Sequence, residues 1–203
     1  MLVHTFSNTV NMNNSTSNRS FHSLAHIALF AALIAAFGLI PKVDLPFGVP
    51  ITLQTLGVML AGCLLGARRG FLAVGLFLLM VATGLPLLAG GRGGLGVFFA
   101  PSAGFLIGWP FGAAACGFVM RYLPHRPGGR VVWLSAVSAA FVGGVVVVYA
   151  FGISGLVLIA HLSWVQAAIA STAFIPGDLL KCAICSALVQ SVARGLPSWR
   201  LAD

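Results

Sequence analysis

Long apolar runs, separated by short polar or glycine- and proline-rich segments, dominate this chain from about residue 21 onward. Most approach the roughly 20 residues that an α-helix needs to cross a bilayer. They are continuous rather than alternating, which argues against the strands of a membrane barrel. The expected helices cover residues 23–40, 51–67, 70–88, 102–123, 131–149 and 177–194. We therefore predict an all-α integral membrane protein with six transmembrane helices in one compact bundle.

Two segments depart from this pattern. Residues 1–20 are rich in Asn, Ser and Thr and lack the basic start and apolar core of a signal peptide. We interpret them as a disordered polar tail, which leaves residues 21–203 as a single domain. Residues 152–176 are apolar but are interrupted by glycines, His161, Ser163 and Pro176. Here the fifth helix is expected to extend or bend, followed by a short interfacial helix from about Trp164.

Composition supports a membrane protein and suggests its orientation. The chain is 59% hydrophobic and 7% charged, with a mean hydropathy of +1.03. Its net charge of +8 does not indicate nucleic-acid binding, because the basic residues lie at the ends of apolar runs. If both termini are cytoplasmic, the inner side holds eight of the eleven basic residues: Arg19, Arg68, Arg69, Arg121, Arg126, Arg130, Arg194 and Arg200. The positive-inside rule predicts this arrangement for an even number of helices.

Rows of small residues indicate close helix packing. Residues 28, 31, 32, 35 and 36 of the first helix are alanines, and Gly104, Gly108 and Gly112 recur at every fourth position of the fourth. Such spacing lets two helix backbones approach each other within a membrane. The alanine rows could serve packing inside the chain or docking of another protein.

Several kinds of chemistry find no support in the sequence. The four cysteines lie inside apolar runs and are interpreted as small buried hydrophobic residues rather than metal or redox groups. No G-x-x-x-x-G-K-[ST] loop is present, so the chain does not hydrolyse ATP by that route. It also lacks H-E-x-x-H and G-x-S-x-G motifs.

The segment IPGDLLK, residues 175–181, concentrates the rarest residues of the chain. Asp178 is one of three acidic residues and Lys181 is one of two lysines. Three positions apart on a helix, they share a face. A carboxylate and an ammonium at the edge of a lipid-buried segment need partners, either each other or a ligand. A local ion pair at the helix start, where Asp178 could cap free N–H groups, is the alternative to a binding site.

A third charged residue is expected at the same membrane face. Arg92 lies in the glycine-rich segment 89–101, in which Gly91 and Gly94 would let the backbone fold back between helices and offer N–H donors. Arg92 could also simply anchor at the lipid headgroups. Together with Asp178 and Lys181, however, it would form the polar part of a small-molecule site.

Further candidates would complete that site. Gln54 and Thr52 begin the second helix, where they could contact a ligand or hydrogen-bond to a neighbouring helix. Five aromatic residues could supply an apolar wall: Phe98, Phe99, Trp109, Tyr149 and Trp164.

Four segments of the chain resemble the BioY family, the substrate-binding membrane subunits of energy-coupling-factor (ECF) biotin transporters. They are VPITLQT (49–55), GARRG (66–70), TGLPLLAGGRGGLGVFFAPSAGFLIGW (83–109) and IPGDLLK (175–181). The resemblance covers residues 21–194. At residues 100–104 the chain reads APSAG where the family usually has GPTGG, which exchanges small residues for small ones.

The resemblance implies high-affinity biotin capture from outside a bacterial cytoplasmic membrane, without catalysis or a cofactor. The family's polar binding residues correspond to Arg92, Asp178 and Lys181, and we expect Gly91, Gly94, Gln54 and Tyr149 to join them. Which cation meets the biotin carboxylate stays open. The implied partners are a transmembrane coupling protein, docked at Ala28 and Ala32, and two cytoplasmic ATPases. The alternatives are a related subunit for another vitamin and a small membrane enzyme that uses Asp178.

Overall fold

The structure is a computed structural model that describes residues 22–44, 49–123 and 130–195. In that part of the chain, seven helices follow one another: His22–Phe37, α2 (Gln54–Leu65), α3 (Ala67–Ala82), α4 (Ala103–Tyr122), the continuous helix of α5 (Arg130–Phe141), η3 (Val142–Val147) and α6 (Val148–Ile159), α7 (Trp164–Thr172), and α8 (Ile175–Gly195). A 3-10 turn, η2 (Leu95–Phe99), lies between α3 and α4. The all-helical prediction is confirmed. The predicted tail, residues 1–20, lies outside the described residues.

Three of the described helices are long and apolar enough to cross a membrane: Ala103–Tyr122, Val132–Ile159 and Ile175–Gly195. The helices His22–Phe37 and Gln54–Leu65 are apolar but shorter. The expectation that the third helix extends to residue 88 is wrong. It ends at Ala82, because Gly84 adopts a φ of 103° and Pro86 cannot continue a helix. The apolar residues 83–88 instead lead into the glycine-rich loop.

The interrupted segment 152–176 folds as expected into an extension and a short helix. The helix through α5, η3 and α6 runs without a break to Ile159. The chain then turns at His161, whose φ is 55°, and α7 begins at Trp164. Ser163 and Gln166 form a capping box that closes the start of α7.

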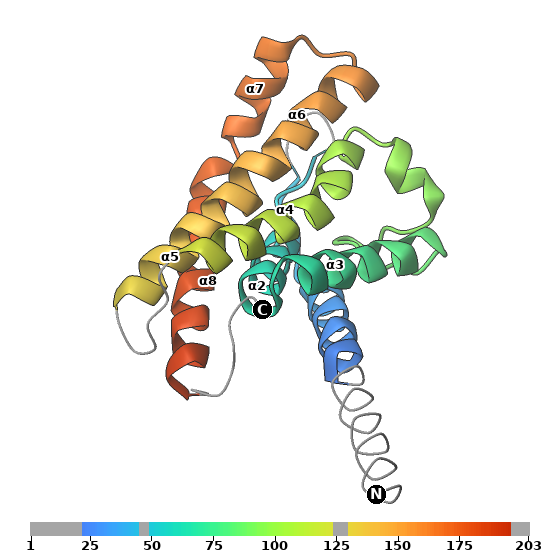
Figure 1. Ribbon diagram of the computed structural model, residues 1–203. Coiled ribbons are helices and arrows are strands. Elements are labelled where there is room, and N and C mark those ends of the chain that lie inside the picture. Colours follow the sequence, from blue (N-terminus) through green and yellow to red (C-terminus); the bar gives the residue numbers. More distant parts are fainter. Residues whose placement is uncertain (1–21, 45–48, 124–129, 196–203) are drawn as a thin grey trace, which may run out of the picture.

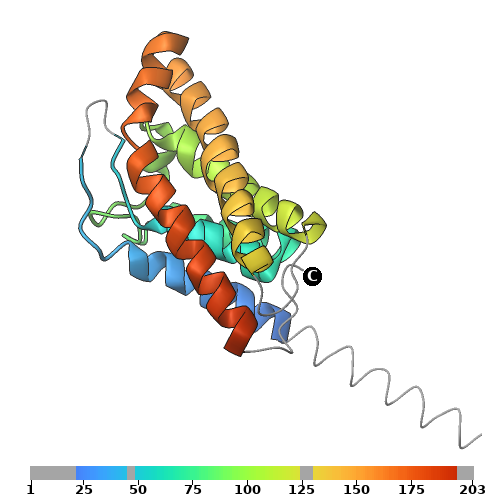
Figure 2. The same ribbon diagram turned by 90° about the vertical axis from the view of Figure 1, so that its left-hand side faces the viewer.

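Helix α4 is the centre of the packing, since it contacts α2, α3, α5, η3 and α6. Its glycine row lies along the η3–α6 helix: a Cβ on Gly104 would lie 2.4 Å from the Phe151 carbonyl oxygen, and one on Gly112 would lie 2.8 Å from that of Gly143. The predicted close approach of backbones is therefore confirmed. Helix α8 packs along α5 and α2, and Figures 1 and 2 show α8 beside α5 in both views.

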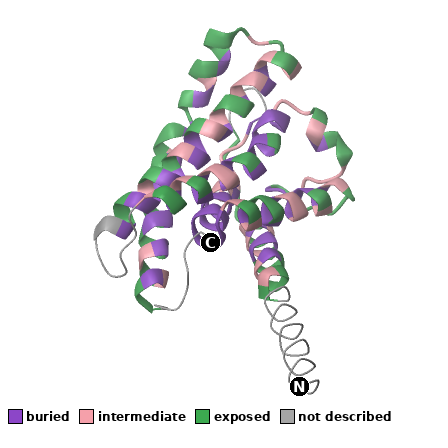
Figure 3. Cartoon of the chain, viewed as in Figure 1, coloured by how far each residue is buried: buried purple, intermediate pink, exposed green. Residues whose placement is uncertain are grey.

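Burial divides the helices into an inner and an outer set. Helix α2 is buried at every position except Thr55, whereas α7 is mostly exposed (Figure 3). The outward faces of α4, α6 and α8 carry large apolar side chains such as Phe118, Leu158 and Leu188. Apolar residues on both the inner and the outer faces are what a bundle surrounded by lipid requires.

We predict that Gly104→Ala destabilises the bundle by about 1–3 kcal/mol, because the added methyl group forces α4 and α6 apart. Thermal unfolding in detergent would measure the effect. Gly75→Ala on α3 is the matched control, since a Cβ there meets nothing within 4 Å. Equal stability of the two variants would contradict the packing role of Gly104.

Candidate functional site

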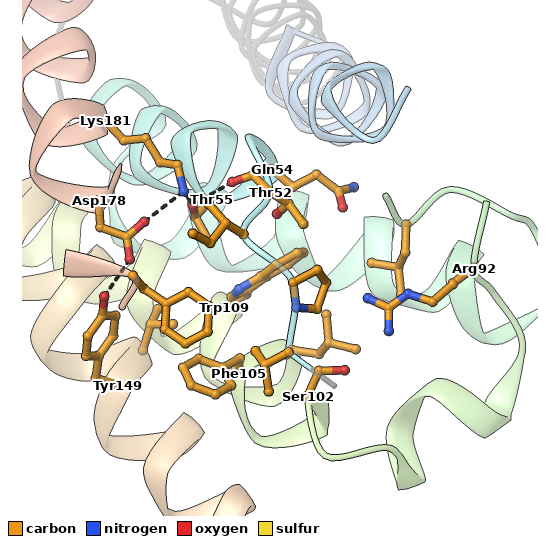
Figure 4. Close-up of a pocket in the computed structure, with 17 residues that line it drawn as sticks. Thr52, Gln54, Thr55, Arg92, Ser102, Phe105, Trp109, Tyr149, Asp178 and Lys181 are labelled. Carbon is orange, nitrogen blue, oxygen red and sulfur yellow. Dashed lines mark hydrogen bonds and ion pairs between the residues drawn. The ribbon is translucent and has the colours of Figure 1, made fainter. Parts of the chain in front are cut away.

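A pocket of about 530 Å³ opens between α2, α4, α6 and α8 and the two loops that precede α2 and η2. Its lining residues are Val49, Pro50, Ile51, Thr52, Gln54, Thr55, Leu88, Arg92, Ser102, Phe105, Leu106, Trp109, Val148, Tyr149, Phe174, Asp178 and Lys181. Figure 4 shows their side chains. The pocket therefore brings together Arg92, Asp178 and Lys181, as the sequence predicted.

One end of the pocket is built on the Asp178–Lys181 ion pair. Lys181 Nζ lies 2.8 Å from Asp178 Oδ1, and both residues are more than nine-tenths buried. Tyr149 on α6 donates its hydroxyl to Asp178 Oδ2 at 2.7 Å, and Lys181 also donates to Thr55 Oγ1 on α2 at 2.9 Å (Figure 4). The prediction that the pair shares one helix face is confirmed. Three helices meet at this four-residue cluster.

The Asp178 carboxylate does not cap its own helix. Helix α8 begins at Ile175, so Asp178 lies within the first turn and its backbone N–H already donates to the Phe174 carbonyl. Its two oxygens accept from Lys181 and Tyr149 instead. Because each oxygen has two lone pairs, both can still accept a hydrogen bond from a ligand. Lys181 has three N–H donors and uses two on Asp178 and Thr55, so one remains for a ligand.

Arg92 reaches the pocket from the glycine-rich loop. Gly90, Gly91 and Gly94 adopt positive φ angles of 80°, 70° and 82°, and an antiparallel bridge joins Leu88 to Arg92. This folded loop places Arg92 across the pocket from Asp178 (Figure 4). Gly91 and Gly94 shape the loop but do not line the pocket.

Gln54 holds that loop against the helices. Its amide group is fully buried, donates to the carbonyls of Ile34 and Leu87, and accepts from the N–H of Ala89. Both donors of the amide are thus used by backbone groups. Gln54 therefore hydrogen-bonds to neighbouring segments of the chain, which was the predicted alternative to contact with a ligand.

The apolar wall differs from the expected one. Trp109 and Tyr149 line the pocket, but Phe98, Phe99 and Trp164 do not, and the last two are 79% and 62% exposed. The expectation failed because η2 turns Phe99 outward and α7 turns Trp164 outward, while Phe98 packs partly buried against the core. Phe105 and Phe174 take their place, with ring centroids 5.6 Å apart.

Sequence reasoning missed several of the lining residues. Thr55, Ser102, Phe105 and Phe174 were not expected in the pocket. The available signal for Thr55 was its own hydroxyl group, which follows Gln54 directly in an otherwise apolar helix. Ser102 precedes α4 but makes no capping hydrogen bond. Its Oγ, Arg92 Nε and Trp109 Nε1 are buried polar atoms without a hydrogen-bond partner among the described residues.

Comparisons with known proteins agree on one family. The BioY family model matches residues 10–198. The chain is 51% identical over 180 residues to the biotin transporter BioY of Rhizobium etli. This alignment covers 88% of this chain and 96% of the relative. It is 47% identical over 186 residues to the biotin transporter BioY of Rhodobacter capsulatus, covering 87% and 95%.

A solved structure shows the same fold. The crystal structure of the S-component for biotin from an ECF-type ABC transporter superposes with a TM-score of 0.78 at 32% identity. The similarity covers 86% of this chain and 92% of that one. This chain thus has the S-component fold of an all-helical, multi-pass membrane protein. The family match over most of the chain, with relatives matched along nearly their whole length, shows that the chain belongs to the BioY family.

Proposed function

We propose that this chain captures biotin and carries it across the bacterial cytoplasmic membrane as the S-component of an ECF transporter. The observation that supports this most directly is a pocket with a buried carboxylate–ammonium pair at one end and an arginine at the other. Membership of a transporter family sets aside a membrane enzyme that uses Asp178. Because the relatives described above are named biotin transporters, biotin is preferred over another vitamin.

The Asp178 end suits the ureido ring of biotin. That ring has two N–H donors and one strongly accepting carbonyl oxygen. Asp178 offers free lone pairs on both carboxylate oxygens, and Lys181 offers one free N–H donor beside them. Hydrogen bonds to charged groups contribute roughly 1.5–3 kcal/mol each. Tyr149 and Thr55 hold the two charged groups in place before the ligand arrives.

The opposite end suits the biotin carboxylate. Arg92 lies across the pocket from Asp178, and the buried hydroxyl of Ser102 lines the pocket on the same side (Figure 4). Both groups can donate hydrogen bonds, and a guanidinium matches the geometry of a carboxylate. A carboxylate at the end of a flexible tail would reach Arg92 while the ureido ring contacts Asp178. We therefore propose Arg92, rather than Lys181, as the carboxylate partner.

We also infer six membrane crossings with both termini in the cytoplasm. Helix α2 has only 12 residues, about 18 Å of helix, which is shorter than a bilayer core. The non-helical residues 49–52 continue this crossing, and non-helical backbone is tolerated at membrane depth where it lines a cavity. In the same way, the loop that follows α3 continues the membrane crossing of that helix. The arginine distribution supports an orientation with both termini inside.

The first helix offers a surface for a coupling protein. Ala28, Ala32 and Ala36 are exposed, whereas Ala31 is buried against the bundle. One of the two alanine rows is therefore used inside the chain and the other is available outside. We propose that the exposed row docks the transmembrane coupling protein, which links this chain to two cytoplasmic ATPases.

Asp178→Asn should weaken biotin binding more than tenfold, because a charged acceptor for the ureido N–H groups is lost. Lys181 keeps its bond to Thr55, so we expect the fold to survive. Calorimetric titration of biotin into the detergent-purified protein, with riboflavin and thiamine as ligand controls, measures the effect. Asp44→Asn, which alters a mostly exposed carboxylate paired with Lys42 outside the pocket, is the matched control. Unchanged affinity in Asp178→Asn would remove this residue from the site.

Arg92→Met should weaken biotin binding roughly tenfold or more and affect the neutral ligand biotinamide much less. The reason is that only biotin presents a carboxylate to the guanidinium. Competition against labelled biotin measures both affinities, with Arg68→Met, at an exposed position away from the pocket, as the control variant. An equal loss for the two ligands would mean that the carboxylate lies elsewhere.

Ala32→Trp should block assembly with the coupling protein and leave biotin affinity unchanged, because the indole interrupts a surface of methyl groups. Co-purification of the chain with its partner subunits measures assembly, and Ala28→Trp should behave in the same way. Ala168→Trp, at an exposed position of α7, is the control. Normal recovery of the complex with both first-helix variants would reject this docking surface.

A further inference from the structure

The indole of Trp109 presents a buried hydrogen-bond donor that the protein leaves unused. Trp109 is 5% exposed and lines the pocket, and its Nε1 has no hydrogen-bond partner among the described residues. An indole nitrogen can only donate, and a buried tryptophan usually finds an acceptor. Leaving a buried N–H unpaired costs free energy. A ligand in the pocket is therefore the natural source of the missing acceptor.

The ring is fixed in position rather than free to turn away. Trp109 projects from the middle of α4, the most extensively packed helix, and its ring lies against Phe77 of α3 with centroids 6.2 Å apart. In Figure 4 the indole lies between Arg92 and Asp178, with its nitrogen on the side of Asp178. The donor thus faces the part of the pocket assigned to the fused rings of the ligand, not to its tail.

The other polar groups of biotin already have partners in the proposed function, on which this inference rests. One ureido N–H meets Asp178, and the ligand's oxygen acceptors have donors: the ureido oxygen meets Lys181, and the carboxylate meets Arg92 and Ser102. The remaining acceptor is the thioether sulfur, which belongs to the ring fused to the ureido ring. Thioether sulfur is a weak hydrogen-bond acceptor. A buried donor that has no other acceptor can still bond to it.

We propose that Trp109 Nε1–H donates a hydrogen bond to the thioether sulfur of biotin. Trp109 is then a specificity-determining residue, because it distinguishes biotin from desthiobiotin, which keeps the ureido ring and the carboxylate tail but has no sulfur. Trp109→Phe keeps an aromatic ring against Phe77 and removes the donor.

Trp109→Phe should reduce the preference for biotin over desthiobiotin, taken as the ratio of their two Kd values, by about two- to tenfold. Lost packing against the groups that both ligands share leaves the ratio unchanged, so the ratio reports on contacts with the sulfur-containing ring, and the N–H group itself is tested by the indole resonance described below. Equal weakening of the two ligands, or no weakening of either, would overturn the assignment. If wild-type protein bound no biotin at all, the proposed function would fail first, and the inference with it.

Ser102→Ala is the matched control, since it removes another unpartnered donor of the same pocket. It should leave the ratio of the two Kd values unchanged, because both ligands carry the carboxylate. A ratio that falls in Ser102→Ala but not in Trp109→Phe would assign the sulfur to Ser102 and overturn the proposal.

Should Trp109→Phe fail to fold, the wild-type protein gives an independent readout. The chain has four tryptophans, so ¹⁵N labelling of the indoles yields a resonance for each, and Trp133→Phe, Trp164→Phe and Trp199→Phe identify that of Trp109 by elimination. Its indole proton should shift downfield on addition of biotin and not of desthiobiotin. The same shift with both ligands, or with neither, would contradict the hydrogen bond to sulfur.

Discussion

The ion pair between Asp178 and Lys181 is the interaction on which this end of the bundle depends. Two charges placed inside an apolar bundle cost more in lost hydration than their attraction returns, unless further hydrogen bonds complete them. Tyr149 and Thr55 supply those bonds from two other helices. The pair therefore fixes how α2, α6 and α8 meet. It also holds one donor and two acceptors in a set geometry, so little ordering remains for a ligand to bring about.

A second constraint acts on the loops that form the non-helical wall of the pocket. Backbone groups within a membrane cannot turn to water, so each needs a partner inside the protein. Where α3 ends and the chain returns to α4, the amide of Gln54 supplies partners to Leu87 and Ala89, and the bridge between Leu88 and Arg92 closes the turn. Arg92 thus stands on a loop whose backbone is bonded to α2 and to itself at these positions, which helps a loop residue to face a buried site.

Sequence patterns predicted the features that depend on local spacing. Apolar runs located the helices, a separation of three residues placed Asp178 and Lys181 on one face, and a four-residue period predicted the glycine contacts of α4. The predictions that failed concern how the helices are rotated about their axes and where they end. Thr55 meets Lys181 across 126 residues, and nothing in an apolar sequence distinguishes the inward Phe105 from the outward Phe99. The unpartnered state of Trp109 is likewise a property of the tertiary fold alone.

Three buried donors, on Arg92, Ser102 and Trp109, have no acceptor in the part of the chain that the structure describes, and they also bear on how a bound molecule leaves. If a ligand accepts from these groups as proposed above, each group loses that acceptor when the ligand departs, and no side chain among the described residues bonds to it instead. Only solvent can do so. Release of a ligand from such a pocket therefore requires hydration of these donors. The exit must widen until water molecules can enter as the ligand leaves. A conformation that opened towards the cytoplasm but stayed dry would retain its cargo.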